Sequence, residues 1–306
     1  MRRVGRTVAA AVAAALALTL AGCGGPLNVG DGDIGGDWAL LPEAKVPTPD
    51  SGVCRPKAGS DKSVDWTLAS FYTEPPVDCA QEHASETYYV GKLPASENDK
   101  TSPPDPGDAG FKSAFTSCAK QASTFLGGDF HNARVSIVPV LPLDHLWQGG
   151  ARWFRCELVE ISDTLETIVT RKASAKDGLR GSRPLAITCA NDTLTSDKKF
   201  VTNVTFIACA KPHYMEYTGV WAPADKKWPG KNAQATAKSE NCFRLGANYL
   251  GMTVSGLHGV GGISWDTWGG SELLWSVGDR GVRCFMGPYD RKKRTGSIKG
   301  KQPSEF

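Results

Sequence analysis

The sequence predicts an α+β protein with two tandem, small, disulfide-linked domains, each a mainly antiparallel sheet with one principal helix. Three observations lead to this prediction. Eight cysteines remain after an export signal is set aside, three blocks of sequence recur in the same order, and strand and helix periodicities alternate within each half. All three observations divide the chain at the same place, between residues 169 and 184.

The N-terminus has the pattern of an export signal. Three arginines precede a mostly small and apolar run, 8–20, which is shorter than the ~20 residues of a transmembrane helix. The sequence Leu-Ala-Gly-Cys that ends at Cys23 resembles the bacterial lipobox, although an ordinary cleaved signal is an alternative. We expect residues 1–22 to be a lipoprotein signal peptide. Acyl chains such as palmitate on Cys23 then anchor the chain to the outer face of the cytoplasmic membrane.

The charge balance argues against nucleic acid as a partner. The chain has 35 Lys and Arg against 32 Asp and Glu, and the signal peptide contains three of the arginines and no acid. The mature chain is therefore formally neutral, which gives no electrostatic basis for binding nucleic acid. Basic residues concentrate in 290–306, where we expect a solvated, disordered tail. Attraction of this tail to anionic headgroups or wall polymers is the alternative.

The cysteines indicate disulfides. The sequence has nine cysteines, and without Cys23 an even number remains in an exported chain. No two of them have the C-x-x-C spacing that is common in structural zinc sites and thioredoxin-like redox motifs. We therefore expect four disulfides among Cys54, Cys79, Cys118, Cys156, Cys189, Cys209, Cys242 and Cys284.

Three blocks of sequence occur twice. Cys79 begins CAQEHASE and Cys209 begins CAKPHYME, which share the spacing C-A-x-x-H-x-x-E. Cys118 and Cys242 are each followed by an aromatic residue and Leu-Gly at the same offsets. The segments WQGGARWFRC and WSVGDRGVRC end at the fourth cysteine of each half and share a Trp, a Gly and two Arg. Matches without gaps in three separate blocks predict a tandem duplication.

The repeats set the expected domain boundaries. We expect modules at 52–169 and 184–289, each long enough for its own core. Residues 170–183 are polar, contain glycine and are rich in basic side chains, so we expect a solvated linker there. Residues 23–51 are rich in Gly, Pro and acidic side chains, which predicts a flexible tether between the lipid and the modules.

Periodicity predicts the elements of each module. Short segments of β-branched and aromatic residues, bounded by Gly, Pro or Asp, predict strands at 86–93, 134–141 and 152–161. A helical stripe lies between the first two strands and stops at Gly127. This stripe comprises Phe111, Phe115, Cys118, Ala122 and Phe125. The second copy has a thinner stripe of Ala235, Cys242 and Tyr249.

The pairing of the cysteines stays open at this stage. Because Cys118 and Cys242 lie on the apolar stripes, their sulfurs point toward a sheet strand, where a disulfide partner fits. If both modules close on themselves in the same way, only three arrangements remain. We slightly favour the arrangement with Cys79–Cys118, Cys54–Cys156, Cys209–Cys242 and Cys189–Cys284.

The combined pattern C…C-x-x-x-H-x-x-E…C…aromatic-Leu-Gly…W-x-x-G-x-R-x-x-C resembles the septum-formation domain of actinobacterial membrane proteins and lipoproteins. The resemblance covers most of the exported chain, twice, and implies a role in septum formation during division rather than a particular reaction. Family members usually have Pro before the histidine, as Pro212 is here, whereas Glu82 departs from that pattern. The residues that carry it are Cys79, His83, Glu86, Cys118, Leu126, Gly127, Trp147, Gly150, Arg152 and Cys156, then Cys209, His213, Glu216, Cys242, Leu250, Gly251, Trp275, Gly278, Arg280 and Cys284.

The His/Glu pairs have two interpretations. His83 with Glu86, and His213 with Glu216, are zinc ligands or an acid/base pair on one interpretation and ordered contacts beside a disulfide on the other. A catalytic zinc needs three protein ligands, and H-x-x-E supplies at most two. The remaining histidines do not repeat between the copies, and the motifs of hydrolases and phosphate-binding loops are missing. We expect a structural or peptide-binding role, no catalytic residue, no metal and no cofactor.

Two tryptophan/arginine pairs are further candidates for binding. Trp147 with Arg152, and Trp275 with Arg280, are each five residues apart, and on one interpretation they stack on each other or clamp an acidic ligand. Packing of the Trp against the disulfide is the plainer interpretation. The segment 264–275, SWDTWGGSELLW, predicts either an exposed recognition surface or core.

These observations support two hypotheses of function. The first is a non-catalytic binding or scaffold lipoprotein that recognises an unidentified division or envelope protein, with two linked sites that raise avidity. The second is a metal-dependent cell-wall hydrolase that uses the His/Glu pairs. We favour the first and expect no enzymatic activity. The oligomeric state is open.

Overall fold

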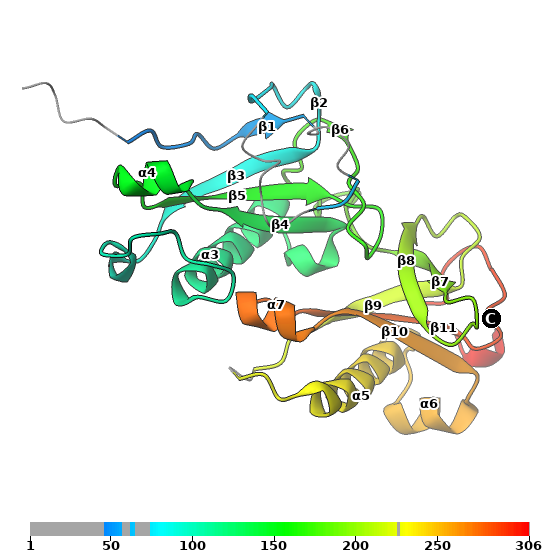
Figure 1. The fold of residues 1–306 in the computed structure, drawn as a ribbon. Coiled ribbons are helices and arrows are strands. Elements are labelled where there is room, and N and C mark those ends of the chain that lie inside the picture. The colour runs from blue at the N-terminus through cyan, green and yellow to red at the C-terminus, as the bar shows by residue number, and fades with distance from the viewer. Residues whose placement is uncertain (1–45, 57–61, 65–73, 225–226, 306) are drawn as a thin grey trace, which may run out of the picture. The chain divides into compact units, whose positions relative to one another are not determined.

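The computed structural model describes residues 46–305 except 57–61, 65–73 and 225–226 (Figure 1). The predicted signal peptide, Cys23 and residues 23–45 of the predicted tether lie outside the described residues. From Val46 onward the chain forms one compact unit. No helix in the described ranges has the length and apolar character needed to span a bilayer.

The first half contains a four-stranded antiparallel sheet with the order β1-β3-β5-β4. β3 (Ser85–Lys92), β4 (Val135–Val140) and β5 (Trp153–Glu160) confirm the three predicted strands, and β1 (Val53–Arg55) lies at the edge. Alternate residues of β5 face opposite sides of the sheet. Phe154, Cys156 and Leu158 belong to the cluster that the long helix α3 (Ala109–Leu126) covers, whereas Val159 belongs to a different cluster.

Helix α3 follows the predicted stripe. Phe111, Ala114, Phe115, Cys118 and Ala122 are buried on one face. Gly127 ends the helix in the left-handed conformation (φ 78°), which glycine adopts without strain, as the sequence predicted. The shorter elements of this half are β2 (Glu82–His83), η1 (Ala95–Glu97), η2 (Phe130–Asn132), α4 (Asp144–Gln148) and β6 (Arg171–Lys172).

The second half repeats this topology. Its antiparallel sheet has the order β10-β11-β9-β7-β8, so that β7-β9-β11-β10 corresponds to β1-β3-β5-β4, and β8 is an additional edge strand (Figure 1). The strands are β7 (Cys189–Leu194), β8 (Val201–Ile207), β9 (Met215–Trp221), β10 (Ile263–Gly269) and β11 (Val282–Pro288). The helices are α5 (Lys231–Leu250), α6 (Val254–Val260), α7 (Glu272–Val277) and the short η3 (Pro303–Glu305).

The buried face of α5 differs from the predicted stripe. Cys242 is buried as expected, but Ala235 is exposed and Tyr249 is only partly buried. The buried positions include Gln234, Gly246 and Ala247, which a search for large apolar residues does not select. The helix therefore offers a small and partly polar face to its sheet.

The two halves share an apolar cluster. Val138, Val140, Val159 and Ile161 of the first half pack with residues of the second half. These second-half residues are Ile187, Ala190, Val204, Phe206, Met215 and Phe285. Because Phe285 alternates along β11 with Cys284 and Met286, which pack with α5, the cluster lies on the sheet faces away from the long helices. The described halves are thus joined through their sheets.

The expected linker and tail are ordered parts of the fold. Within 170–183, Ala175 and Leu179 are buried in the cluster under α3. Within 290–305, Ile298 is buried against residues of α5 and α6. Both segments are rich in basic side chains, and one or two buried apolar residues and several backbone hydrogen bonds hold each of them against the fold.

The described residues form four disulfides, and each lies within one half, as predicted. The favoured pairing was wrong, since the bonds are Cys54–Cys79, Cys118–Cys156, Cys189–Cys209 and Cys242–Cys284. The helix lies over the centre of the sheet, so Cys118 meets Cys156 on the central strand β5, at a Cα separation of 5.4 Å. The motif cysteine lies in a turn before β3 or β9 and meets the cysteine of β1 in the first half or of β7 in the second.

Disulfide mapping checks this pairing. Proteolysis of the unreduced protein should release a peptide pair joined through Cys118 and Cys156, and another through Cys242 and Cys284. Replacing both Cys118 and Cys156 by Ala should lower the free energy of unfolding by about 4 kcal/mol, because the unfolded chain loses a long covalent loop. A peptide that links Cys79 to Cys118 would contradict the structure.

A partly buried polar contact also joins the halves. His131 in η2 places its Nδ1 2.8 Å from Asp129 and its Nε2 2.9 Å from Asp279, which follows α7 in the second half. Arg283 donates to the His131 carbonyl at 2.9 Å. Burial alone would lower the pKa of His131, but the hydrogen bonds to the two carboxylates outweigh burial and raise it. The imidazole is therefore stabilised in its protonated form.

This contact predicts a pH-dependent stability. A raised folded pKa contributes stability that is fully present below the unfolded value of ~6.5 and is lost as the pH rises through the folded pKa. The difference in unfolding free energy between the wild type and His131→Gln should therefore be largest near pH 5 and shrink toward pH 9. Denaturant titrations at several pH values measure it. In an Asp279→Asn background the same difference should be smaller and flatter, and an unchanged profile would contradict the contact.

Candidate functional site

The C-x-x-x-H-x-x-E motifs lie at the same place in each half, where the chain enters β3 or its counterpart β9. His83 and Glu86 are buried, as are His213 and Glu216. Residues three apart on one strand point to opposite faces, but His213 lies before β9 begins, so it can face Glu216. Its Nε2 lies 3.4 Å from Glu216 Oε1. No partner for Nε2 of His83 is found among the described residues.

Each glutamate binds a segment that follows the last strand of its own half. In the first half Glu86 accepts hydrogen bonds from Ser174 Oγ at 2.6 Å and from the Ala175 backbone N–H at 2.7 Å. In the second half Glu216 accepts the equivalent bonds from Ser297 Oγ at 2.6 Å and the Ile298 N–H at 2.7 Å. Since a buried carboxylate needs several donors, these bonds hold the segment in place.

We call residues 171–177 and 294–300 the closing straps. Each strap begins by pairing with the motif histidine, Arg171 with His83 in a short ladder and Arg294 with His213 in a single bridge. Two residues later a backbone N–H binds the carbonyl of the motif cysteine. These bonds run from Ala173 to Cys79 at 2.7 Å and from Gly296 to Cys209 at 2.8 Å.

The straps are a fourth repeated block that sequence reasoning missed. Aligned on their serines, both read R-x-x-S-x-K, with Arg171, Ser174 and Lys176 matching Arg294, Ser297 and Lys299. The repeat is visible in the sequence, but it lies inside segments whose basic composition predicts a linker and a tail. The glutamates of the motif therefore have partners that no motif search named.

Tyr249 adds a further contact in the second half. Its hydroxyl donates to Glu216 Oε2 at 2.5 Å, and burial together with this hydrogen bond raises the pKa of Tyr249. With the serine, the backbone N–H and His213, the carboxylate has four neighbours. Both of its oxygens are thus occupied by the protein.

Trp147 and Arg152 form a closed contact. The Trp147 side chain is buried, and the Arg152 guanidinium lies 3.8 Å from its ring centroid. Trp147 Nε1 donates to the Lys100 carbonyl at 2.8 Å. Arg152 donates to the carbonyls of Glu97, Asn98, Lys100, Trp147 and Ala151. The guanidinium therefore binds backbone of its own half.

The corresponding pair in the second half is looser. Trp275 is buried, but the Arg280 guanidinium lies 5.4 Å from its ring centroid, and Arg280 Nε has no acceptor among the described residues. Trp275 instead meets Trp228 edge to face at 5.4 Å. The three tryptophans of 264–275 differ in their surroundings. Trp275 is core, Trp268 stacks on Arg283, and Trp265 is 40% exposed.

The donor sets near the motifs suit a metal poorly. Cys189, Cys209 and His213 lie close together, and so do Cys54, Cys79 and Glu86. The sulfurs of each group are bonded to each other, so they are not the thiolates that bind zinc. Glu86 is already bonded to its strap. The disulfides and the glutamate bonds therefore hold the closing strap and the edge of the sheet together in each half.

The sequence profile of the septum formation family matches residues 64–284 in one continuous span, more than two thirds of the chain. The chain belongs to the septum formation family. No curated protein and no solved structure matches it.

The septum formation match takes in both halves. It starts after β1 and ends at Cys284, so it includes the first strap and stops before the second. The resemblance predicted two copies of the family domain, and the comparison gives one match that spans both structural repeats. Membership supports a role in septum formation or cell division.

The strap contact predicts a large loss of stability on removal of its acceptor. Glu216→Ala leaves the Ile298 N–H, Ser297 Oγ and Tyr249 O–H without their buried partner, which should lower the unfolding free energy by about 2–4 kcal/mol. Hydrogen exchange should show the Ile298 amide losing protection. Glu240→Gln, an exposed change on α5, is the matched control and should alter neither quantity. Unchanged protection at Ile298 would show that the strap does not depend on Glu216.

Proposed function

We propose that this member of the septum formation family is a lipid-anchored protein of the outer face of the cytoplasmic membrane that binds a division or envelope protein without catalysis. The observation that carries the proposal is how the motif side chains are bonded and buried. In both halves the cysteines are oxidised, the histidines are buried, and the glutamates are bonded to the closing straps. Groups that could have formed a reaction centre are used to hold the fold.

A tandem duplication supports the binding role. The two sheets have the same strand order, the disulfides connect equivalent positions, and the strap contacts repeat atom for atom. We infer that one ancestral domain was copied and that the copies then joined through their sheet faces. Such a frame presents surfaces to a partner and has no need of a moving catalytic group.

The metal-dependent hydrolase is less well supported. It would require His213 or His83 to bind an ion together with a glutamate whose oxygens already accept two or more hydrogen bonds. Freeing these oxygens would release a strap and leave its backbone N–H unpaired in a buried place. The geometry therefore favours a structural use of the pairs.

The test is the location of the protein in dividing cells. A fluorescent fusion should concentrate at division septa, and short-range crosslinking should join it to a division or envelope protein. Cys23→Ala removes the proposed site of lipidation, so the fusion should leave the membrane fraction. Lipidation and septal targeting are thereby measured separately.

Two controls make the result decisive. Cys209→Ser with Cys189→Ser should lower the melting temperature, since this pair closes the second half. His213→Ala should leave a purified preparation without a change in zinc content. Stoichiometric zinc that is lost in His213→Ala would overturn the non-catalytic proposal, and a diffuse membrane signal without septal enrichment would overturn the role in division.

A further inference from the structure

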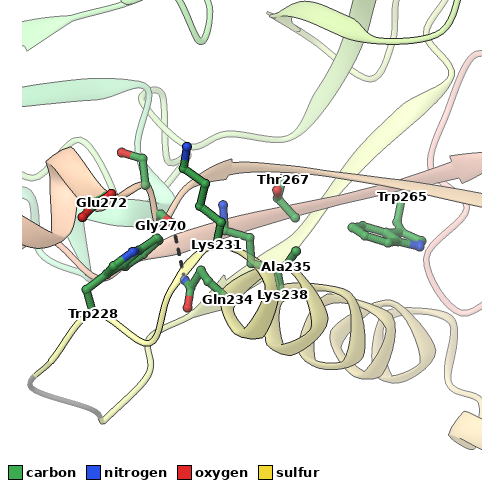
Figure 2. Close-up of a pocket in the computed structure, with 10 residues that line it drawn as sticks. Trp228, Lys231, Gln234, Ala235, Lys238, Trp265, Thr267, Gly270 and Glu272 are labelled. Carbon is green, nitrogen blue, oxygen red and sulfur yellow. Dashed lines mark hydrogen bonds between the residues drawn. The ribbon is translucent and has the colours of Figure 1, made fainter.

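A pocket of about 400 Å³ lies between α5 and β10 in the second half. Trp228, Lys231, Gln234, Lys238, Trp265 and Glu272 are among its lining residues. In Figure 2 the two tryptophans stand on either side of the first turns of α5, from which Gln234 and both lysines project. Its volume is in the range of pockets that bind small ligands or short peptide segments.

The pocket lies where α5 has the small side chain of Ala235 in place of a large side chain of α3. Counting from the disulfide cysteines, Ala235 and Ser239 occupy the positions of Phe111 and Phe115. In the first half these phenylalanines are almost fully buried between the helix and the sheet. Trp265 pairs with Met286 across the sheet, and Ile137 pairs with Leu158, so Trp265 and Ile137 hold equivalent positions. Trp265 is nevertheless 40% exposed, whereas Ile137 is 2% exposed.

The first half fills the neighbouring place with its own acidic segment. Gly110 corresponds to Gln234, since both lie eight residues before the helix cysteine. A Cβ on Gly110 would lie 2.6 Å from Glu97 Cδ, so the buried carboxyl group of η1 packs directly on this turn of α3. The connection that carries η1 spans 93–108, whereas its counterpart spans only 222–230. The shorter connection leaves the second pocket open.

Gln234 supplies a polar group without a partner. The side chain is 2% exposed, and its Nε2 faces the Gly270 carbonyl at 3.4 Å. Its Oε1 has no hydrogen-bond partner among the described residues. A buried acceptor left in this state costs free energy, which a donor on a bound ligand would recover.

The charges of the lining residues favour an anion. Lys231 and Lys238 outnumber Glu272, and the first turn of α5 adds the positive end of a helix dipole. Among the described residues Lys238 donates one hydrogen bond, to the Gly269 carbonyl at 2.7 Å, so two of its three N–H groups can donate to a ligand. Burial lowers the pKa of Lys238 although Asp266 acts in the opposite direction, so a nearby carboxylate would favour the charged ammonium.

We propose that this pocket binds an acidic peptide segment of a partner protein. A carboxylate of the peptide lies at Lys231 and Lys238, an apolar side chain packs between Trp228 and Trp265, and a backbone N–H donates to Gln234 Oε1. The first half supports a peptide as the occupant, because there a short segment with a glutamate occupies the adjoining turn. The inference rests on the proposed binding function and gives it a site.

The test uses two matched sets of blocked pentapeptides. One set has a central Glu flanked by Ala, Leu, Phe or Trp, and the other has Gln in place of Glu. The full-length chain in detergent is labelled at the tryptophan indole nitrogens, and the Trp228 and Trp265 N–H signals are followed by NMR during titration. Glu peptides should shift these two signals and bind about tenfold more tightly than their Gln partners, since a charge-assisted hydrogen bond is lost in the latter.

Variants separate the pocket from the rest of the surface. Lys231→Gln should remove the preference for Glu, and Trp265→Ala should weaken all peptides by about fivefold. Ala235→Phe restores the ring that the first half has, so it should abolish binding without lowering the melting temperature. Lys112→Gln and Tyr289→Ala change an exposed lysine and an exposed aromatic residue elsewhere and should leave binding unchanged.

Three results would overturn the inference. The first is equal affinity for Glu and Gln peptides, and the second is binding that survives Ala235→Phe. The third is a response of the same indole signals to glucuronate, relative to glucose, without a response to any peptide, which would assign the pocket to an acidic saccharide. None of these results bears on septal enrichment of the fusion, so the proposed function is tested independently.

Discussion

The disulfide between the long helix and the central strand is the constraint on which both halves depend. In the first half it is reinforced by Phe111 and Phe115, whose burial contributes about 2–3 kcal/mol each. The second half has Ala235 and Ser239 at these positions, so little apolar surface holds the beginning of α5 to its sheet. A bond such as Cys242–Cys284 stabilises by about 2–4 kcal/mol, enough to offset much of that loss. The covalent link therefore permits a helix with a pocket beneath it.

A second constraint closes each half. Burying a carboxylate is unfavourable unless donors surround it, so Glu86 and Glu216 fix the position of whatever segment supplies those donors. The straps do so with one serine and one backbone N–H each. The repeated His and Glu, which suggest a reaction centre in the sequence, are in this way elements of the frame.

Much of the fold could be predicted from the sequence, because it depends on local periodicity. The strands 86–93, 134–141 and 152–161 and the helix that ends at Gly127 were found within a residue or two. The pairing of the cysteines depends on which strand lies under the helix, and no local pattern records that. Ordering of the expected linker and tail rests on the burial of single apolar residues such as Ala175 and Ile298, which basic neighbours conceal.

The pocket was harder to predict than the motifs because it arises from missing side chains. In the sequence it corresponds to the small number of large apolar residues along α5. A search for apolar residues takes this pattern as a sign of a weaker helix and not of a space beside the helix. The difference between the two halves also affects how many binding sites a partner would meet. The closing straps are equivalent in the two halves, whereas Phe111, Phe115 and Glu97 fill in the first half what the second leaves open.

A partner that binds the proposed pocket would meet one such site in the described part of each chain, so the avidity expected from two equivalent modules does not apply to it. Affinity must then come from contacts around one site, and the shared cluster that joins the sheets contributes by holding the second half in a fixed frame. Under the proposals of a duplicated domain and a peptide pocket, the first half supports the fold and the second half binds. The same disulfide and strap serve both, and the residues under the helix set the difference between them.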